Sequence, residues 1–490
     1  MFEHFPRRPR PALMPAALIV LAVLGDAGPI RAETYFVSAS TGNDRNPGSP
    51  SAPYRTIQRA LNALSPGDDV VIDTGRYLES PRLRKLRAMP DDYTEIRAAA
   101  GATVSIEALN DPENPKAAFL IEDSTFIRLE GIRIEGARRH GIGVFRSNHV
   151  QLVDNRTYNT GQSGIRARYV NDILLDGNDV SRAVQRRNQE SVSLSNADGF
   201  VIRNNFVHDR PRRDSLQQKG GVGRGGEGID VKDGSRNGRI HDNRVDGIEG
   251  KLGIYVDAYD TDSFNIDVFN NTVTNSGCGF AFSTENGTST SGYLHDVRVF
   301  NNLSFGNRCG IYFGNHGGDS SRSDQVRRVE DVSVYNNTVI GNGLKTGGGG
   351  IDIANPNAAR LTIRNNLVAD NQSGQIRLSG KLKSLPPGSV IENNLVRGSP
   401  GELPIGDNLA GDPGLFDPSV GDFRLTLGSA AIDAGFAEGA PEFDHRGVAR
   451  PQGTGIDIGA FEFRPVSGDT VDDPFPAMPD QTTAPRESEQ

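Results

Sequence analysis

The chain has 490 residues, a formal net charge of −9, 58 glycines and no tryptophan. A chain of this length can bury a large core, and a repetitive elongated fold would do so without dividing it into several globular units. The many Gly and Asn residues, with only 4 Met, favour repeated turns and argue against a fold of packed helices.

The first 32 residues have the pattern of a secretion signal. Arg7, Arg8 and Arg10 form a basic start, residues 12–24 are apolar, and residues 30–32 resemble a cleavage site. We predict a signal peptide (1–32) and a secreted protein, periplasmic or extracellular, either free or associated with the cell surface. An uncleaved anchor is the alternative. No later segment is apolar enough to cross a membrane, so we expect no membrane-spanning segment in the mature chain.

Residues 33–66 are predicted to form an N-terminal cap. Residues 35–37 have the composition of a strand, and residues 56–64 (TIQRALNAL) place Ile57, Ala60 and Leu61 on one face of a short amphipathic helix. Such a segment would cover the open hydrophobic end of a solenoid. Residues 70–72 (VVI) would begin the first coil.

A motif built around Asn-Asn recurs from residue 155 to residue 394, at steps of 23 to 38 residues. A unit of this length is the signature of a solenoid. The second Asn of each copy, or the single Asn of a degenerate copy, stands at Asn155, Asn178, Asn205, Asn243, Asn271, Asn302, Asn337, Asn366 and Asn394.

Each repeat contains three short segments of alternating polarity. One follows a glycine, as in Gly228–Lys232 and Gly253–Asp257, a second precedes the Asn, and a third follows it. Period-2 alternation indicates half-buried strands. Three strands in about 30 residues predict a parallel β-helix over residues 67–398, with roughly 10–12 coils. Asn tolerates the left-handed backbone of a sharp corner, and stacked Asn amides can form a ladder of hydrogen bonds.

The two cysteines, Cys278 and Cys309, occupy matching places in neighbouring repeats, each directly before a glycine. They would lie about 4.8 Å apart, within reach of a disulfide. The alternatives are a disulfide, which export permits, and two stacked buried thiols.

The character of the sequence changes after the last Asn-Asn motif. Residues 399–463 carry segments such as DPGLF, GDFRL and DIGAFE and form a predicted C-terminal module. We expect Asp433, Asp444 and Asp457 to form turns and caps there. Residues 464–490, rich in Pro, Asp, Ser and Thr, are predicted to be disordered.

From Glu33 to Val396 the chain resembles the right-handed parallel β-helix proteins of the pectate lyase-like superfamily. Residues 41–61 resemble the N-terminal region of exported β-helix polysaccharide lyases, and the C-terminal module resembles that of exported bacterial β-helix surface proteins. The resemblance implies the fold. It leaves the function open, because this scaffold hosts lyases, hydrolases, epimerases and adhesins.

Side chains that point outward from the Gly-initiated strands should form rows across successive coils. Most positions in these rows are small or neutral. The exception is an ionisable group of predicted site residues on two coils: Glu227, Asp230, Lys232, Lys251, Tyr255 and Asp257.

Two interpretations of this group remain open. It is either a surface network of salt bridges or the site of β-elimination on a uronate polysaccharide. In the second case Glu227, Asp230 and Asp257 would bind Ca²⁺, Lys232 or Lys251 would remove the C5 proton, and Tyr255 would donate a proton to the leaving oxygen.

Basic residues beside this face would attract an acidic polysaccharide despite the negative net charge. A solvated flexible loop is the alternative explanation for those in the long segment 208–226. Nucleic acid is disfavoured, because interleaved aromatic residues are missing and the protein is expected to be exported. The predicted substrate-binding residues are Arg166, Arg168, Arg210, Arg212, Arg213, Arg224, Tyr312 and His316.

The sequence therefore predicts a monomeric, exported polysaccharide lyase for an acidic polysaccharide. The alternatives are a uronate C5-epimerase, a glycoside hydrolase on the same scaffold, and a non-catalytic glycan-binding protein of the cell surface or matrix. The motifs of β-helix polygalacturonases are not found at matching places, although Asp230 and Asp257 would in principle supply the two carboxyl groups that hydrolysis requires.

Overall fold

The computed structural model describes residues 32–464, except for 91, 109–115, 187–188, 211–225, 286–291, 316–327, 344–347, 381 and 399–406. The predicted signal peptide, apart from Ala32, lies outside the described residues, as does the predicted tail from residue 465. Among the described residues, no helix has the length and apolar character needed to cross a membrane.

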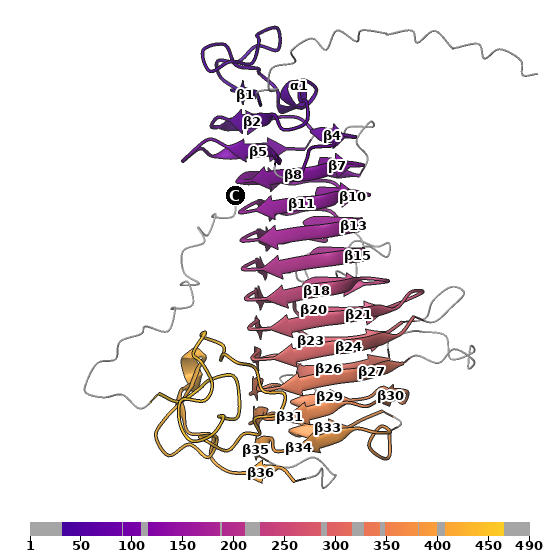
Figure 1. Cartoon of the computed structure of the whole chain (residues 1–490), viewed down its shortest axis with the longest axis vertical. Helices are drawn as coiled ribbons and strands as arrows, with labels where there is room; N and C mark the ends of the chain where they lie inside the picture. The colour runs from indigo at the N-terminus through magenta and orange to yellow at the C-terminus, as the bar shows by residue number, and fades with distance from the viewer. Residues whose placement is uncertain are drawn as a thin grey trace, which may run out of the picture.

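The described chain is a stack of coils in which each strand pairs in parallel with its equivalent in the next coil (Figure 1). The Gly-initiated strands and the strands before the Asn corner belong to one 23-stranded sheet, and the strands after the corner form a second sheet of 13 strands. This arrangement confirms the predicted parallel β-helix. Each successive described coil contributes one strand to the second sheet. Its 13 strands are therefore close in number to the expected 10–12 coils.

The Gly-initiated column contains β4 (Arg82–Arg84), β7 (Ala117–Glu122), β10 (His140–Phe145), β17 (Ile229–Lys232), β20 (Leu252–Ala258), β23 (Cys278–Thr284), β26 (Cys309–Asn315), β29 (Ile351–Ile353) and β33 (Ile376–Leu378). Two long strands, β13 (Ile165–Asp176) and β15 (Val192–Arg203), continue from this column into the next. The column before the corner contains β1 (Thr34–Val37), β2 (Asp69–Ile72), β5 (Thr94–Ala98), β8 (Thr125–Glu130), β11 (Asn148–Val153), β18 (Arg236–His241), β21 (Ser263–Phe269), β24 (Leu294–Phe300), β27 (Val329–Tyr335), β30 (Ala358–Ala359), β31 (Thr362–Arg364) and β34 (Val390–Glu392).

The second sheet contains β3 (Gly75–Tyr77), β6 (Val104–Glu107), β9 (Ile132–Glu135), β12 (Arg156–Tyr158), β14 (Asp179–Ser181), β16 (Phe206–His208), β19 (Arg244–Asp246), β22 (Thr272–Thr274), β25 (Leu303–Phe305), β28 (Thr338–Ile340), β32 (Leu367–Ala369), β35 (Leu395–Arg397) and β36 (Leu409–Ala410). The inward residues of all three columns form one continuous core of Ile, Val, Leu and Phe, which runs the length of the stack.

The two asparagines at each corner have different tasks. The first has a left-handed backbone, with φ between 51° and 55° at Asn204, Asn270, Asn301, Asn336, Asn365 and Asn393. The second is buried, and its side-chain NH₂ donates to the side-chain oxygen of the equivalent Asn in the next coil. This ladder runs without a break from Asn155 to Asn408. The sequence predicted both tasks but assigned them to one residue.

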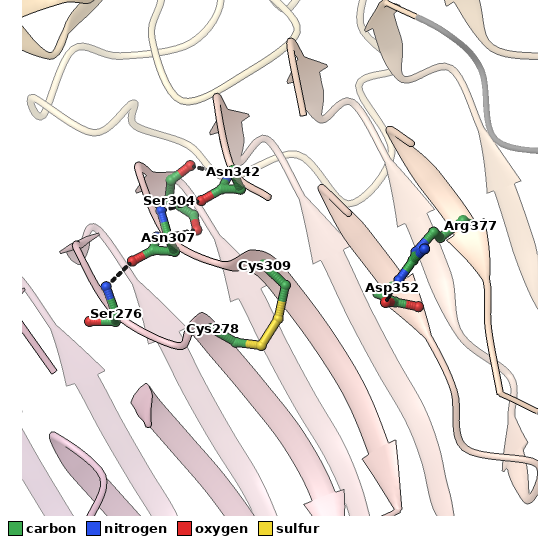
Figure 2. Close-up of a disulfide and its surroundings, with 8 residues drawn as sticks. All are labelled: Ser276, Cys278, Ser304, Asn307, Cys309, Asn342, Asp352 and Arg377. Carbon is green, nitrogen blue, oxygen red and sulfur yellow. Dashed lines mark hydrogen bonds and ion pairs between the residues drawn. A yellow bond between two sulfur atoms is a disulfide. The ribbon is translucent and has the colours of Figure 1, made fainter. Parts of the chain in front are cut away.

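A second, shorter ladder was not predicted. The backbone N–H of Ser276 donates to Asn307 Oδ1 (2.9 Å), and the backbone N–H of Asn307 donates to Asn342 Oδ1 (3.1 Å) (Figure 2). It stabilises the turn just before the Gly-initiated strands. The same close-up shows Cys278 joined to Cys309 in a disulfide, with Cα atoms 4.4 Å apart, so of the two alternatives the structure contains the bridge.

The N-terminal end of the core is covered as the sequence predicts. Helix α1 (Ile57–Leu61) is shorter than the expected 56–64 and buries Ile57, Ala60 and Leu61. Its N-cap is Thr56, whose side chain accepts a hydrogen bond from the backbone N–H of Arg59. Figure 1 shows α1 at one end of the stack, beside β1 and β2.

The C-terminal segment from residue 407 packs along the flank of the last coils, with β37 (Leu415–Asp417), β38 (Asp422–Leu425) and a 3₁₀ turn (Pro418–Val420) (Figure 1). Its apolar residues, including Phe423 and Phe461, form a second core with outward residues of the 13-stranded sheet. The first asparagines of four corners donate to its backbone carbonyls, namely Asn301 to Phe443, Asn336 to Asp457, Asn365 to Phe436 and Asn393 to Ala434.

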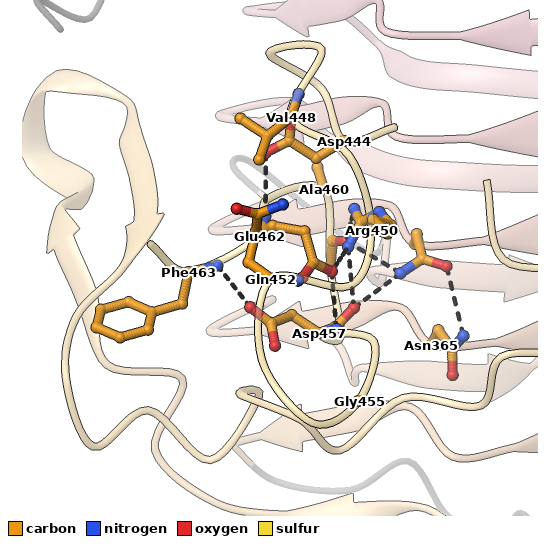
Figure 3. A network of polar contacts seen from close by, with 12 residues as sticks. Asn365, Asp444, Val448, Arg450, Gln452, Gly455, Asp457, Ala460, Glu462 and Phe463 are labelled. Carbon is orange, nitrogen blue, oxygen red and sulfur yellow. Dashed lines mark hydrogen bonds and ion pairs between the residues drawn. The ribbon is translucent and has the colours of Figure 1, made fainter. Parts of the chain in front are cut away.

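The aspartates of this segment act as predicted, as acceptors for backbone N–H groups. Asp444 accepts from Val448 (Figure 3), Asp433 accepts from Gly455, and Asp457 accepts from the N–H of Asp433. They therefore stabilise turns.

Candidate functional site

The predicted rows of outward side chains are present in the register that the Asn motif implied. Arg166 of β13 pairs with Ser193 of β15, which pairs with Asp230 of β17, which pairs with Tyr255 of β20. A parallel row brings Arg168, Ser195 and Lys232 into line. Residues up to about 90 positions apart in the sequence thus share one face.

This face is less accessible than a surface groove would be. Asp230 is 1% exposed, and Tyr255 and Asp257 are each 2% exposed, although their side chains point away from the main hydrophobic core. Lys232 retains 22% of its side-chain exposure. The expectation of an exposed salt-bridge network is therefore wrong for the carboxyl groups, which are removed from water.

Lys232 lies at the centre of the cluster. Its Nζ donates to Asp230 Oδ2 and to Glu190 Oε1, each at 2.7 Å. Glu190 was not predicted as a site residue. The second carboxylate oxygen of Glu190 accepts from the Ser193 hydroxyl at 2.7 Å and lies 3.5 Å from the Arg166 guanidinium. Glu190 is therefore held by two cations and a hydroxyl group.

The pKa values of the carboxyl groups in the cluster are shifted in opposite directions. Burial raises the pKa of Asp230 well above its usual value, more than Lys232 lowers it. Burial also raises the pKa of Asp257, and the neighbouring Asp230 adds to this shift. For Glu190, burial is outweighed by Lys232, Ser193 and Arg166, which together lower its pKa. The site thus combines carboxyl groups that favour the protonated form with one that favours the ionised form.

The surroundings of Lys232 stabilise its charged form. Burial acts to lower the pKa of Lys232, but the adjacent Asp230 and Glu190 carboxylates raise it well above its usual value. A general base needs a free amine. The structure therefore favours Lys232 as a fixed cation over the predicted role as a base.

Tyr255 and Lys251 are each bound to one acidic residue. The Tyr255 hydroxyl donates to Glu285 Oε1 at 3.2 Å, and burial raises the pKa of Tyr255 well above its usual value, so the phenol keeps its proton. Lys251 donates to Glu227 Oε1 at 3.3 Å, with a third of its side chain exposed.

Among the described residues, one group of three carboxylates has oxygens close enough together to hold a cation: Glu190, Glu227 and Asp230, within 4.8 Å of one another. It contains two of the three predicted Ca²⁺ ligands and replaces Asp257 by Glu190. Ca²⁺ takes 6–8 oxygen ligands. Two of these carboxylates already bind the Lys232 ammonium, which provides the positive charge a metal would otherwise provide. The arrangement therefore does not fit Ca²⁺.

The remaining predicted substrate-binding residues are dispersed. Arg168 is exposed and lies over the ring of Tyr169, and Tyr312 follows Ala281 in the row. Arg210 donates to the Glu249 carbonyl, two residues before Lys251. The other predicted residues lie outside the described residues: Arg212, Arg213, Arg224 and His316.

Three further residues belong to the cluster or its edge. Glu190 lies two residues before Val192, which pairs with Ile229 of the next coil, so Glu190 and Glu227 occupy equivalent positions. His140 occupies the same position two coils earlier. This register was available from the sequence. Glu285 directly follows β23, and no repeated position in the sequence indicated that it would join the cluster. Burial and the nearby Arg166 lower the pKa of His140 to about 3, so its imidazole is neutral.

Comparisons with known proteins agree on the fold and differ in function. Residues 82–278 match a family model described as "Periplasmic copper-binding protein (NosD)", and residues 40–82 match a family of unknown function, DUF1565. No curated protein sequence matches the chain.

Several solved structures are similar in shape. XylC in complex with xylose shares 13% identity and a TM-score of 0.54, over 87% of this chain and 98% of that one. Pectate lyase Pel9A shares 16% identity and a TM-score of 0.49, over 88% and 96% of the two chains. The periplasmic alginate epimerase AlgG shares 13% identity and a TM-score of 0.45, over 73% and 84%. Together with the stacked parallel sheets, the likeness to XylC identifies the chain as a right-handed parallel β-helix protein.

Proposed function

We propose that the protein is exported and cleaves an acidic polysaccharide at the cluster formed by Glu190, Asp230, Lys232 and Asp257. The observation that carries the proposal is the geometry of the cluster: the Lys232 ammonium donates to Asp230 and Glu190 at 2.7 Å each, and all three carboxyl groups of the cluster are buried. Pairs of titratable groups whose environments separate their pKa values are typical of acid–base sites.

Hydrolysis of a glycosidic bond is the reaction that these groups support best. A protonated Asp257 would donate its proton to the glycosidic oxygen as the C–O bond breaks. The Glu190 carboxylate would take a proton from the water that attacks the anomeric carbon, and Lys232 and Arg166 would keep Glu190 ionised. Each hydrolysis consumes one water and leaves one new reducing end.

β-Elimination is the second candidate, supported by Lys251. Among the described residues this lysine has one carboxylate partner, at 3.3 Å, and it is more exposed than Lys232, so a substrate would reach its amine more readily. Its amine would remove the C5 proton of a uronate, and a protonated Asp257 would donate a proton to the leaving oxygen. Either reaction requires a protonated carboxyl group, but only elimination creates a double bond.

Neither proposed step is routed through a metal, because Lys232 already binds two carboxylates of the three-residue group and Lys251 binds the third. We do not extend copper binding from the matched family to this chain. The potential ligand group among the described residues consists of carboxylates, which suit hard cations better than copper, and both cysteines are in the disulfide.

The test is to incubate the purified protein with pectate, alginate and hyaluronan, with and without Ca²⁺. New reducing ends without ultraviolet absorbance indicate hydrolysis, and reducing ends with the absorbance of unsaturated uronates indicate elimination. A changed NMR spectrum of intact polymer would indicate epimerisation instead. Retention of a polymer without any change in it would indicate a binding protein.

Matched variants connect the activity to the cluster. Asp257→Asn and Glu190→Gln each remove one candidate acid or base and should reduce cleavage by about 10²–10⁴-fold. Asp198→Asn removes a carboxylate of β15 in a surface pair with Arg236, and should leave the rate unchanged. Full activity of both cluster variants would rule out the proposed site.

A further inference from the structure

A pocket of about 150 Å³ opens on the turns before β10, β13 and β15, and it is lined by Arg138, Arg139, Gln162 and Arg186. The three arginines are exposed, and Gln162 is buried. The pocket is therefore lined by three arginines around one small volume.

Backbone contacts between neighbouring turns hold the pocket together. The N–H of Gln162 donates to the Arg139 carbonyl (3.0 Å), and the N–H of Arg186 donates to the Gly161 carbonyl (2.9 Å). A Cβ atom on Gly161 would lie 2.1 Å from the Arg138 carbonyl oxygen and 3.2 Å from Arg186 Cδ. Glycine is thus required for the turns, and with them the arginines, to approach so closely.

Several arginines on the outer surface of the coils are paired with an acid from a neighbouring coil. Arg146 pairs with Asp123, Arg203 with Asp176, Arg298 with Asp267, Arg360 with Asp331 and Arg397 with Asp370. In contrast, neither Arg139 nor Arg186 has an acidic partner within the part of the chain that the structure describes. Like charges held together without a counterion repel one another, and the planar guanidinium is suited to bidentate binding of an oxyanion.

The pocket lies close to the candidate site. Arg139 directly precedes His140, and Gln162 directly precedes Ser163, which has the register position of Glu190 in the next coil. With coils about 4.8 Å apart and residues about 3.3 Å apart along a strand, pocket and cluster are on the order of 10 Å apart. A polysaccharide that lies along the stack would contact both.

We infer that the pocket of Arg138, Arg139 and Arg186 is a subsite that binds an oxyanion group of the substrate, a carboxylate or a sulfate ester, and positions the chain for cleavage at Glu190. This inference rests on the proposed function and names the chemistry by which the substrate is selected.

Binding without turnover tests the subsite directly. The probes are pectate, which carries carboxylates, dextran sulfate, which carries sulfate esters, and neutral dextran. Isothermal titration of each polymer against the full-length protein is compared with the variant Arg139→Gln/Arg186→Gln. We expect this variant to bind the preferred anionic polymer at least about tenfold more weakly, because it loses two charge-assisted contacts. Its melting temperature verifies that it is folded.

The control is Arg298→Gln, which removes an arginine from a surface pair with Asp267 and should leave binding within about twofold of wild type. Weaker binding of pectate by the double variant would indicate a carboxylate ligand, and weaker binding of dextran sulfate would indicate a sulfate ester. Equal binding by the double variant and the wild type, or no preference for either polyanion over dextran, would overturn the subsite. Strong arginine-dependent binding without cleavage would uphold the subsite and refute the catalytic proposal.

Discussion

Asn205 donates its side-chain amide to Asn243 Oδ1 at 2.9 Å, although 38 residues separate them. The next step of the ladder, from Asn243 to Asn271, spans 28 residues and has a length of 3.0 Å. The longest repeat therefore accommodates its extra residues without disturbing the stack. The coil that carries Asp230 and Lys232 keeps its register with Glu190 for this reason.

The ladder should contribute to stability through its buried amides. Asn243→Ala removes the acceptor of two hydrogen bonds from Asn205 and the donor to the Ile202 carbonyl. Buried polar groups that lose their partners cost about 1–3 kcal/mol each, so we expect a loss of about 3 kcal/mol or more in the free energy of unfolding, measured by urea denaturation. Asn62→Ala, which removes an exposed amide at the end of α1, should cost less than about 1 kcal/mol. Equal losses would show that the ladder has no special role.

The Lys232 ammonium should set the acid limb of the activity profile. Lys232 is the largest of the influences that lower the pKa of Glu190. In Lys232→Met the pKa of Glu190 should rise, so that activity is lost at higher pH on acidification than in the wild type. Cleavage rates between pH 3 and 8 measure the shift. Lys383→Met, on the exposed surface, should have the wild-type profile, and an unmoved acid limb in Lys232→Met would exclude Glu190 as the ionised group.

His208 should make stability dependent on pH. Burial acts to lower the pKa of His208, but hydrogen bonds to the carboxylates of Asp179 and Asp209 raise it to about 9, from 6.5 in the unfolded chain. A raised pKa contributes stability that is fully present below pH 6.5 and is lost as the pH rises through 9. Urea denaturation from pH 6 to 10 should show this loss in the wild type but not in His208→Gln.

Removal of one partner should weaken the effect. Asp209→Asn keeps the histidine and its bond to Asp179, so its stability should fall less steeply with pH than that of the wild type. Identical pH dependence in the wild type and in His208→Gln would contradict the assignment.

The sequence could predict the fold and the rows because both depend on spacing. Once the repeats are aligned on the Asn motif, period-2 alternation determines that Asp230 lies between Ser193 and Tyr255, and the structure confirms it. The same register placed Cys278 beside Cys309 but could not decide between thiols and a disulfide, because both fit at that separation.

Burial and partners could not be predicted, because they depend on side-chain conformations and on residues at the ends of strands. Glu190 belongs to a turn, and no alternation pattern indicates that it bends toward Lys232. The protonation preferences of Asp230 and Asp257 follow from their desolvation, which the sequence does not reveal. For this reason the sequence predicted Lys232 as a base, whereas the structure favours a fixed cation.

The C-terminal segment should depend on one buried ion pair for its attachment to the β-helix. Arg450 and Glu462 are each fully buried at the side chain and lie 2.5 Å apart (Figure 3), and Arg450 also donates to the Gly459 carbonyl and to Asn301 of the coil. Removing one partner of a buried pair costs about 3–5 kcal/mol. In Arg450→Met the segment should therefore detach more readily.

Limited proteolysis measures this detachment, because cleavage within residues 407–464 requires the segment to open. We expect Arg450→Met to be cut there at least about tenfold faster than the wild type, while the coils resist. Arg424→Met, which removes an arginine paired at 2.6 Å with Asp422 two residues away in the same hairpin, controls for loss of charge and should change the rate much less, since that pair lies within the hairpin. If both variants resist proteolysis equally, apolar packing of Phe423 and Phe461 on the 13-stranded sheet is sufficient to hold the segment.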